Sequence, residues 1–482
     1  MINHFNFKRE QDGTFLITND YGCYDFLTKE EFLSMVKGSI TESSSLYRRL
    51  RKKSFLLEPP DIFAEKTAEQ FRGMKNYLFQ GTDLHIFVMT NQCNLQCIYC
   101  QAQDHMAVKK GMMSIETGRK AIDVALQSPN HHLTFEFQGG EPLLNFPVIR
   151  QMIIYAEQMK GEKQIDFTLV SNFSLLTEEI ADFLLAHKVA ICTSLDGPEE
   201  LHDRNRKAMN GRSSYQAMLR GRKILMERGC LPSAIQTTTR YSLGKAKEII
   251  REYLAEGQQS IFIRPLTPLG FAKSDWEKIG YTAEEFLNFY QEALQEIIRL
   301  NLKGIFFKEQ HACFFLKKML RGEADNYMEL RSPCGATFGQ LAYYYDGSIY
   351  TCDEARMVAE AGSPAFRLGD VYTSSYRDLL SSRVCKAAAE ASVLETLPGC
   401  CDCVYQPYCG VCPVVEYALH GNIFAQEPNG YRCRIYKGIL DCLFAVLRHG
   451  TDAEQQVLKS WVEDEHENHQ EEAISRNQRR PS

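Results

Sequence analysis

Between residues 84 and 266, short apolar runs rich in β-forming residues alternate with longer stretches whose apolar residues recur at helical spacing. This pattern predicts strands joined by helices long enough to connect parallel neighbours. The predicted strands are Leu84–Thr90, Leu133–Gly140, Ile165–Asn172, Lys188–Leu195, Ser233–Arg240 and Ser260–Leu266. The predicted helices are Ile115–Gln127, Val148–Met159, Thr177–Ala186, Tyr215–Arg228 and Lys245–Glu256. We therefore expect an α/β fold, an open (β/α)6 partial TIM barrel, with its site at the carboxyl ends of the strands.

The segments on either side of the barrel predict further units. Residues 1–80 contain two β-runs, Phe5–Arg9 and Thr14–Thr18, and a helix at about Lys29–Val36, which predicts a small α+β module. The core spans 81–305, and the largely helical stretch Thr282–Leu320 leads into a cysteine-rich extension over 306–450. Residues 451–482 are charged and polar, so we expect a disordered tail.

Composition restricts the possible functions. The chain has 482 residues, 44% of them hydrophobic, which suffices for two or three domains with a sizeable core. Its net charge of -6 gives no reason to expect nucleic acid as a partner. The amino terminus does not resemble a signal peptide, and the apolar runs are too short to span a membrane, so we expect a cytoplasmic protein.

The clustering of the seventeen cysteines carries the strongest chemical signal. In a large chain of this type, clustered cysteines indicate metal or redox chemistry rather than disulfides. The first set, Cys93, Cys97 and Cys100, directly follows the first predicted strand. Three thiolates on one tight loop can ligate three irons of a 4Fe-4S cube and leave the fourth iron open for a chelating substrate. A zinc site is the alternative, although zinc loops favour paired cysteines with a fourth ligand nearby.

This loop resembles the signature of the radical S-adenosylmethionine (SAM) superfamily, in which SAM binds the open iron. The turn after the second strand, with two glycines and a carboxylate, resembles the superfamily motif that binds the amino group of SAM. The resemblance assigns SAM binding to Tyr99, Gln138, Gly139, Gly140, Glu141, Ser171, Asn172, Ser194, Arg206 and Leu266. We expect Ser194 and Arg206 to hold the carboxylate of SAM, because a hydroxyl and a guanidinium suit that role. Capping or turn roles are the alternative, notably for Ser171.

The second cysteine set resembles the SPASM extension of anaerobic sulfatase-maturating enzymes and peptide maturases, although the step from Cys409 to Cys412 is one residue shorter than the family pattern. The resemblance implies two auxiliary 4Fe-4S clusters. It assigns one to Cys400, Cys403, Cys409 and Cys433, and the other to Cys334, Cys352 and Cys412. The second set lacks an evident fourth cysteine, for which Cys401 is a candidate. A structural zinc ribbon is the alternative reading.

One carboxylate beside this set is a candidate catalytic group. Asp353 directly follows Cys352, as the general base does in sulfatase-maturating relatives. A partly desolvated carboxylate there could accept the proton released after hydrogen abstraction from a substrate. The neighbouring Glu354 competes for this role, and a solvated turn acid is the alternative.

Several stretches narrow the resemblance to the radical maturases of His-Xaa-Ser repeat peptide systems. They include Phe15–Asn19, Leu133–Gln138, Ile263–Leu266 and Val404–Tyr408. The resemblance implies an enzyme that cleaves SAM reductively to a 5'-deoxyadenosyl radical and modifies a ribosomally made peptide or protein. The implied partners are that precursor, an electron donor such as flavodoxin or ferredoxin, and a second maturase.

Other functions stay open. The edge of the short sheet at Thr14–Thr18 is a candidate binding site for the precursor peptide, with a packing module as the alternative. The alternative activity is formylglycine formation by a sulfatase-maturating type of enzyme. A non-enzymatic iron-sulfur or zinc protein is the third possibility.

Overall fold

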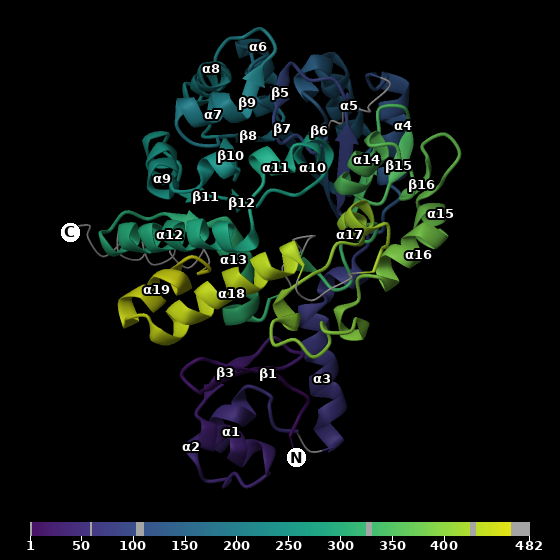
Figure 1. The fold of residues 1–482 in the computed structure, drawn as a ribbon. Helices are drawn as coiled ribbons and strands as arrows, with labels where there is room; N and C mark the ends of the chain where they lie inside the picture. Colours follow the sequence, from purple (N-terminus) through teal and green to yellow (C-terminus); the bar gives the residue numbers. More distant parts are fainter. Residues whose placement is uncertain (1, 58–59, 103–109, 324–329, 425–429, 464–482) are drawn as a thin grey trace, which may run out of the picture.

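A nine-stranded sheet forms the centre of the computed structural model, which describes residues 2–57, 60–102, 110–323, 330–424 and 430–463 (Figure 1). Its strand order is β12-β10-β8-β7-β6-β4-β14-β15-β16. Six of these strands pair in parallel in the order of the sequence. They are β4 (Leu84–Val88), β6 (His132–Gln138), β7 (Gln164–Val170), β8 (Ala190–Ser194), β10 (Ser233–Thr237) and β12 (Ile263–Arg264). The predicted α/β barrel core is confirmed.

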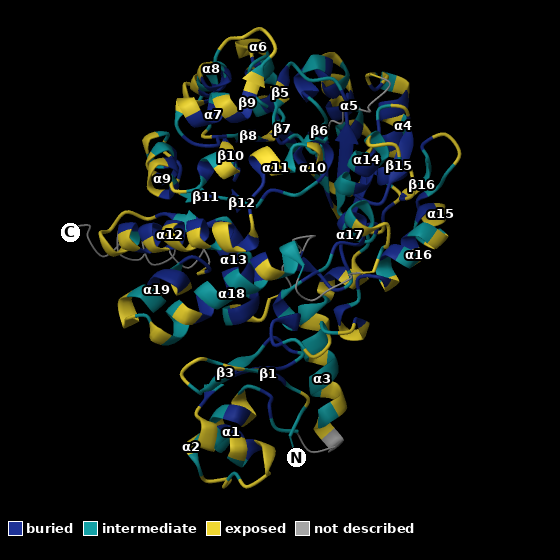
Figure 2. Cartoon of the chain, viewed as in Figure 1, coloured by how far each residue is buried: buried dark blue, intermediate teal, exposed yellow. Residues whose placement is uncertain are grey.

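Helices between these strands cover one face of the sheet. They are α4 (Ile115–Ala125), α5 (Phe146–Met159), α6 (Glu178–Ala186), α7 (Glu199–Asn205), α8 (Ser214–Met226) and α9 (Ala246–Ala255). Burial alternates along the strands: in β6, Leu133, Phe135 and Phe137 are buried, whereas the residues between them are partly exposed. In Figure 2, exposed residues appear mainly on the peripheral helices, such as α12 (Ala283–Leu302) and α19 (Asp452–Ser460). The apolar side chains pack in the core, and the polar positions line the barrel interior.

The sheet continues beyond the barrel in a way that the sequence pattern did not predict. The added strands are β14 (Gln340–Tyr343), β15 (Ser348–Tyr350) and β16 (Arg367–Asp370). β14 lies parallel to β4, and β15 pairs with it antiparallel. The turn between β14 and β15 contains Gly347 with φ +92°, a conformation that favours glycine. The cysteine-rich extension therefore shares a sheet with the barrel.

The N-terminal module is a three-stranded antiparallel sheet with helices, at the bottom of Figure 1. Its elements are β1 (Asn6–Arg9), β2 (Phe15–Thr18), β3 (Tyr24–Leu27), α1 (Lys29–Val36), α2 (Ser45–Lys52) and α3 (Pro60–Met74). β3 was not predicted, and it makes β2 the central strand. The Thr14–Thr18 strand therefore offers no edge to a peptide, which corrects that expectation; the edges belong to β1 and β3.

The carboxyl-terminal region is mostly helical. Its main helices are α12 (Ala283–Leu302), α13 (Gln310–Leu316), α14 (Asp353–Glu360), α15 (Tyr376–Ser381), α16 (Arg383–Glu390), α17 (Pro413–His420), α18 (Tyr431–His449) and α19 (Asp452–Ser460). The short elements between the barrel and this region are α10 (Gly270–Ser274), α11 (Trp276–Ile279), β11 (Ser260–Ile261) and β13 (Lys308–Glu309). In the described ranges, no helix is both long and apolar enough to cross a membrane.

The expected disordered tail is wrong for its first part. Helix α19 begins after Thr451, whose side chain accepts a hydrogen bond from the Glu454 amide and completes a capping box. Val457, Leu458 and Trp461 are buried in the main core, where α19 packs on α12 and α18. The polar residues occupy the outer face of an amphipathic helix. Residues 464–482 lie outside the described ranges.

Candidate active site

The first cysteine loop lies at the carboxyl end of β4 and is fixed by a short strand pair. β5 (Leu95–Cys97) pairs antiparallel with β9 (Arg206–Ala208), so that Cys97 lies opposite Arg206. The Leu95 amide donates to Cys93 Sγ at 3.4 Å, and the Cys100 amide donates to the Cys97 carbonyl at 3.1 Å. The loop is thus closed on itself and anchored to the chain after β8.

The three thiols lie close enough to affect one another's ionisation. Burial raises the pKa of Cys97 to about 12, and Cys100 adds to the rise while Arg206 opposes it. Burial also raises the pKa of Cys93, with further contributions from Cys97 and Cys100. Thiolates that are buried together need a cation to offset their charge. The donor set therefore fits a cationic iron-sulfur cluster, whose ligands must be thiolates.

The two glycines after β6 contact the cysteine loop. The Gly140 amide donates to the Thr90 carbonyl and the Glu141 amide to the Gln92 carbonyl, both at 2.8 Å. A Cβ on Gly140 would come 2.1 Å from the Gln92 carbonyl oxygen, and one on Gly139 would come 2.3 Å from the Thr90 oxygen. Gly139 also has φ +148°. Glycine is required here because two backbone segments touch.

Glu141 is buried, and its carboxylate is bound by neighbouring donors. Oε1 accepts from Ser171 Oγ at 2.7 Å and from the Leu143 amide at 3.1 Å, and Oε2 accepts from the Asn172 amide at 2.9 Å. Burial raises its pKa, and these hydrogen bonds oppose the rise. Three of the residues assigned to SAM, Glu141, Ser171 and Asn172, are thus brought together as one network.

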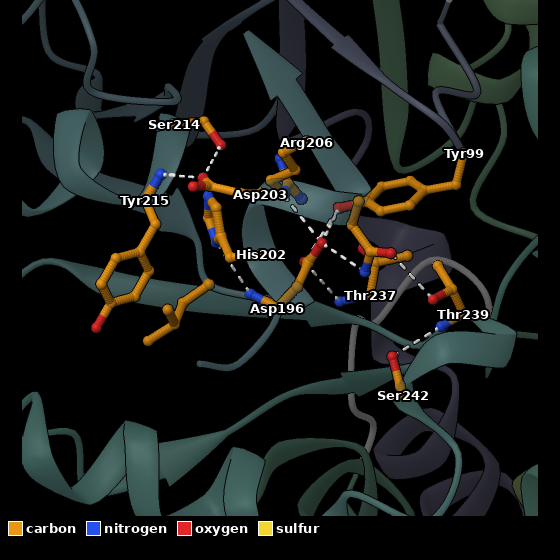
Figure 3. A network of polar contacts seen from close by, with 12 residues as sticks. Tyr99, Asp196, His202, Asp203, Arg206, Ser214, Tyr215, Thr237, Thr239 and Ser242 are labelled. Carbon is orange, nitrogen blue, oxygen red and sulfur yellow. Dashed lines mark hydrogen bonds and ion pairs between the residues drawn. The ribbon is translucent and has the colours of Figure 1, made fainter. Parts of the chain in front are cut away.

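Arg206 belongs to a second network, which is centred on Asp196 (Figure 3). Asp196 is fully buried and pairs with Arg206 Nε at 3.2 Å. Its carboxylate also accepts from the Tyr99 hydroxyl at 2.8 and 3.0 Å and from Asn205 Nδ2 at 3.1 Å. The Arg206 guanidinium lies 5.2 Å from the centre of the Tyr99 ring. The negative charge of Asp196 raises the pKa of Arg206, against the effect of burial.

The other residues assigned to SAM binding lie at strand ends. Ser194 ends β8 and is partly exposed, and Gln138 ends β6. Leu266 is buried just after β12, and its amide donates to the Tyr281 hydroxyl at 2.6 Å. These positions place the set along the carboxyl-terminal edge of the barrel.

Several carboxyl-terminal cysteines lie close enough to affect one another's ionisation. The pKa of the Cys409 thiol is raised to about 12. Burial is the main cause, and the neighbouring thiols of Cys433, Cys403 and Cys400 add to it. Five cysteines line a cavity of about 330 Å³ together with Arg264 and Leu266 from the end of β12; they are Cys400, Cys403, Cys409, Cys412 and Cys433. The structure thus combines grouped thiols with free volume, which fits auxiliary clusters.

The second set combines Cys334, Cys352 and Cys412. Burial raises the pKa of the Cys352 thiol, and Glu354, Cys412 and Cys334 raise it further. Cys352 and Cys412 immediately precede α14 and α17, which pack against each other. Among the described residues, no three His, Cys, Asp or Glu side chains are close enough to hold a single metal ion.

Cys401 differs from the second set in its surroundings. Cys401 is exposed, and it raises the pKa of Cys400, which belongs to the other set. The structure thus offers no support for Cys401 as the fourth ligand of the Cys334, Cys352 and Cys412 set, and that assignment stays a prediction. The charged side chains that act on the Cys412 thiol are instead Arg432, which lowers its pKa, and Glu354, which raises it.

The two neighbouring acids of α14 face different surroundings. The Asp353 carboxylate accepts a hydrogen bond from Arg356 Nε at 2.7 Å. Its negative charge raises the pKa of Glu136 in the barrel interior. The charge of Glu354 instead raises the pKa of all three thiols of the second set. Of the two candidates for a general base, Asp353 is therefore the one that faces the barrel.

Sequence reasoning missed two acids of this site, Asp196, which is fully buried, and Glu136, which is partly buried in the barrel interior. Burial raises the pKa of Glu136 to about 7, Asp353 raises it further, and Arg264 and Arg356 oppose the rise. The available signal for Glu136 was its place among the polar residues that alternate with apolar ones along β6, since one face of such a strand lines the barrel interior. For Asp196 the signal was an acid two residues beyond a strand end at the barrel mouth.

Comparison with known sequences agrees with this geometry. Residues 87–246 match the sequence model of the Radical SAM superfamily. An uncharacterised protein of Methanocaldococcus jannaschii is 33% identical over 269 residues, which cover 55% of this chain and 83% of that protein. A cysteine-type anaerobic sulfatase-maturating enzyme of Clostridium perfringens is 25% identical over 300 residues, covering 60% of this chain and 77% of the enzyme.

Solved structures share the fold. The structure of anSMEcpe with bound AdoMet and the Cp18Cys peptide matches 77% of this chain and 98% of its own, with a TM-score of 0.66 and 20% identity. Streptococcus suis SuiB bound to the precursor peptide SuiA matches 89% of this chain and 98% of its own, with a TM-score of 0.54 and 13% identity. The cysteine loop, the parallel barrel and these similarities lead to one conclusion: the chain belongs to the radical SAM superfamily and is a radical SAM enzyme, a family that implies a 4Fe-4S cluster and SAM.

Proposed function

We propose that this enzyme modifies a side chain of a ribosomally synthesised peptide or protein, and that His-Xaa-Ser type precursor peptides are its substrates. The observation that carries the proposal is the combination of three features in the barrel and its extension. They are the first cysteine loop, the cavity of about 330 Å³ lined by carboxyl-terminal cysteines, and a polar interior that Asp353 faces. The similarity in fold to SuiB, whose structure holds a precursor peptide, supports a peptide substrate.

The residues at the barrel mouth would divide the work. Cys93, Cys97 and Cys100 would hold the cluster that, with SAM, supplies a 5'-deoxyadenosyl radical for hydrogen abstraction. Ser194 and Arg206 would hold the SAM carboxylate. Within the described residues, Asp196 accepts a hydrogen bond from Arg206 Nε alone, so the other N–H groups of the guanidinium can donate to the SAM carboxylate.

Asp353 would accept the proton that the substrate releases after hydrogen abstraction. Arg356, itself buried, fixes one carboxylate oxygen through its Nε and leaves Asp353 directed at the interior. Asp353→Asn should retain SAM cleavage and lose product, because the amide keeps the shape but cannot take a proton. Glu354→Gln is the matched control and should leave proton transfer intact. Full product formation by Asp353→Asn would remove this residue from the mechanism.

We also propose that the two carboxyl-terminal cysteine sets hold auxiliary 4Fe-4S clusters, with flavodoxin or ferredoxin as the electron donor. The test is a Cys93/Cys97/Cys100→Ala variant, in which the ligands of both sets are untouched. It should stay brown and contain iron and sulfide, while forming no 5'-deoxyadenosine. Zinc without iron in this variant would reassign the region to a structural ribbon.

The N-terminal module would bind the precursor by adding a strand to the β1 edge. The other edge, at β3, is partly covered, because Lys53 Nζ donates to the Tyr24 carbonyl at 2.8 Å. Arg9 lies on β1 with an exposed side chain. The Glu10 amide donates to the Thr14 carbonyl, and backbone hydrogen-bonding direction alternates along an antiparallel strand, so the Arg9 amide faces away from β2, toward the open edge. Arg9→Pro should weaken binding of a labelled precursor in fluorescence anisotropy, whereas Arg9→Ala should change it little. Equal affinity of both variants would exclude the β1 edge.

The overall proposal is tested with purified anaerobic enzyme, SAM, reductant and two sets of peptides. One set carries His-Xaa-Ser repeats, with and without the candidate second maturase, and the other carries the Cys or Ser of sulfatase-type substrates. A mass change confined to the first set, mapped by fragmentation, is the expected result. Formylglycine in the second set would instead favour the sulfatase-maturating alternative. A non-enzymatic role is no longer a candidate, because the chain belongs to an enzyme superfamily.

A further inference from the structure

One face of the N-terminal sheet packs on the carboxyl-terminal cysteine region. Successive side chains of a strand point to opposite faces of the sheet. We call the face that packs on the cysteine region the docking face; the other face covers the module's own core. The opposite face packs within the module, where Phe15 stacks on Phe32 with ring centres 4.0 Å apart. The docking face consists of Asn6, Lys8, Leu16, Thr18, Tyr24 and Phe26.

The docking face contacts the loop between Cys400 and Cys409. Asn6 Nδ2 donates to the carbonyls of Cys401 and Cys403, both at 3.2 Å. The Thr18 hydroxyl donates to the Val404 carbonyl at 2.7 Å. In return, the Tyr408 hydroxyl donates to the Gly22 carbonyl at 2.8 Å. Asn6 and Thr18 are buried, so these hydrogen bonds are shielded from water.

A second contact joins the same loop to α18. Lys8 Nζ donates to the Tyr405 hydroxyl at 2.8 Å and to Asp441 at 2.6 Å, and Tyr405 also donates to Asp441. Asp441 lies on α18, the helix that begins next to Cys433. On the same helix, the Phe444 ring packs edge-on against Tyr24 and Phe26. The docking face therefore holds together the loop and the helix that carry the first carboxyl-terminal cysteine set.

From these contacts we propose that the N-terminal sheet positions the Cys400, Cys403, Cys409 and Cys433 ligand set, with Asn6 as the principal positioning residue. Its two acceptors are the carbonyls of Cys401 and Cys403, so one amide fixes the backbone on both sides of Asp402 and with it the direction of the Cys403 thiol. This inference rests on the proposed auxiliary cluster. It also links the module to that cluster: a ligand that shifts the docking face changes the cluster's surroundings, and the coupling is reciprocal.

The test compares Asn6→Ala with Asn3→Ala in the full chain. Asn3 is the matched control, because its Nδ2 donates at 3.1 Å to the Ser54 carbonyl inside the module. Two measurements are made in the Cys93/Cys97/Cys100→Ala background, so that only the auxiliary sites contribute. The first is the electron paramagnetic resonance spectrum and midpoint potential of the reduced protein. The second is amide hydrogen exchange over residues 400–406, which does not depend on iron.

Asn6→Ala should shift both the spectrum and the potential, and should speed exchange of the loop about tenfold, the factor that corresponds to losing about 1.4 kcal/mol of hydrogen bonding. Asn3→Ala should leave the spectrum and the loop exchange unchanged. Thr18→Val is a second variant, which removes the donor to Val404 at nearly constant volume and should act in the same direction. Loop exchange and spectra identical in all three variants would overturn the positioning role. If the background protein lacks iron, the auxiliary-cluster proposal fails while the exchange measurement still decides the positioning role.

Discussion

Replacing Asp196 by Asn should destabilise the barrel strongly. The change keeps the size and shape of the side chain but removes the charge that balances Arg206. Asp196 is fully buried, and Arg206 is 9% exposed. The remaining donors to this carboxylate are the Tyr99 hydroxyl, Asn205 and the Thr237 amide at 3.4 Å, none of which is charged. The variant therefore leaves a guanidinium in the barrel wall without a counterion.

The expected magnitude follows from that burial. Removing one partner of a buried ion pair costs about 3–5 kcal/mol, whereas breaking an exposed pair costs about 0.2–1 kcal/mol. A folding unit of 150–250 residues loses about 2–4 °C in Tm per kcal/mol, so the expected fall is roughly 6–20 °C. Because Arg206 lies opposite Cys97 in the β5–β9 pair, the first cysteine set should also bind less iron.

The assay is anaerobic thermal unfolding with iron analysis, in parallel with Asp182→Asn. Asp182 pairs with Arg228 at 2.5 Å, but its side chain is 65% exposed, so this variant makes the same chemical change at the surface. A double variant, Asp196→Asn with Arg206→Met, removes both charges and should recover part of the lost stability. Equal Tm values for Asp196→Asn and Asp182→Asn, or no recovery in the double variant, would refute the argument from uncompensated charge.

Three further predictions concern the cysteine loops and the barrel interior. Gly140→Ala should lose iron from the first cysteine set, because the added Cβ would lie 2.1 Å from a backbone oxygen of the loop. The control variant Gly73→Ala has open space around the added Cβ and should retain this iron. Equal iron contents in the two variants would contradict the prediction. Cys401→Ser should retain auxiliary iron while Cys412→Ser loses part of it, since Cys401 is exposed and Cys412 is buried with its set. The folded-state pKa of Glu136, about 7, lies above the usual 4.5, so the folded protein binds more protons and loses stability as pH rises between these values. Glu136→Gln removes this pH-dependent loss of stability. The Tm of the variant relative to that of the parent protein should therefore rise as the pH increases from 4.5 to about 7. A Tm difference that stays constant over this pH range would argue against the raised pKa.

The barrel could be predicted because its signal is local. Each of the six strands is a short apolar run, and each helix that follows has apolar residues at helical spacing, so period and length identify them. The added strands β14 to β16 carry the same kind of signal, but they join the barrel through β14, whose partner β4 lies more than two hundred residues earlier in the sequence. Pairing over such a distance leaves no local pattern, and the cysteines drew attention to metal binding instead.

Two errors had the same physical origin. The polar residues of α19 suggested disorder, but Val457, Leu458 and Trp461 are buried where α19 packs on the preceding helix α18 and on α12, which is distant in the sequence. The Thr14–Thr18 strand is not an edge, because β3 pairs with its second side although β3 contains Asp25, a residue type that is depleted in strands. Asp25 is paired with Arg49 at 2.6 Å, so a charge that seemed unsuited to a strand is compensated by a helix of the same module. Tertiary partners decided both cases.

Helix α14 shows how one short segment serves both halves of the molecule. Successive residues of a helix point about 100° apart, so the neighbours Asp353 and Glu354 cannot face the same surroundings. The packing of α14 on α17 directs Glu354 to the thiols of the second set and leaves Asp353 beside Arg356, facing Glu136. A displacement of α14 would therefore change the carboxylate in the barrel and the charge beside the cysteines together. In the proposed enzyme this link would set the distance between the site of proton removal and the second cysteine set.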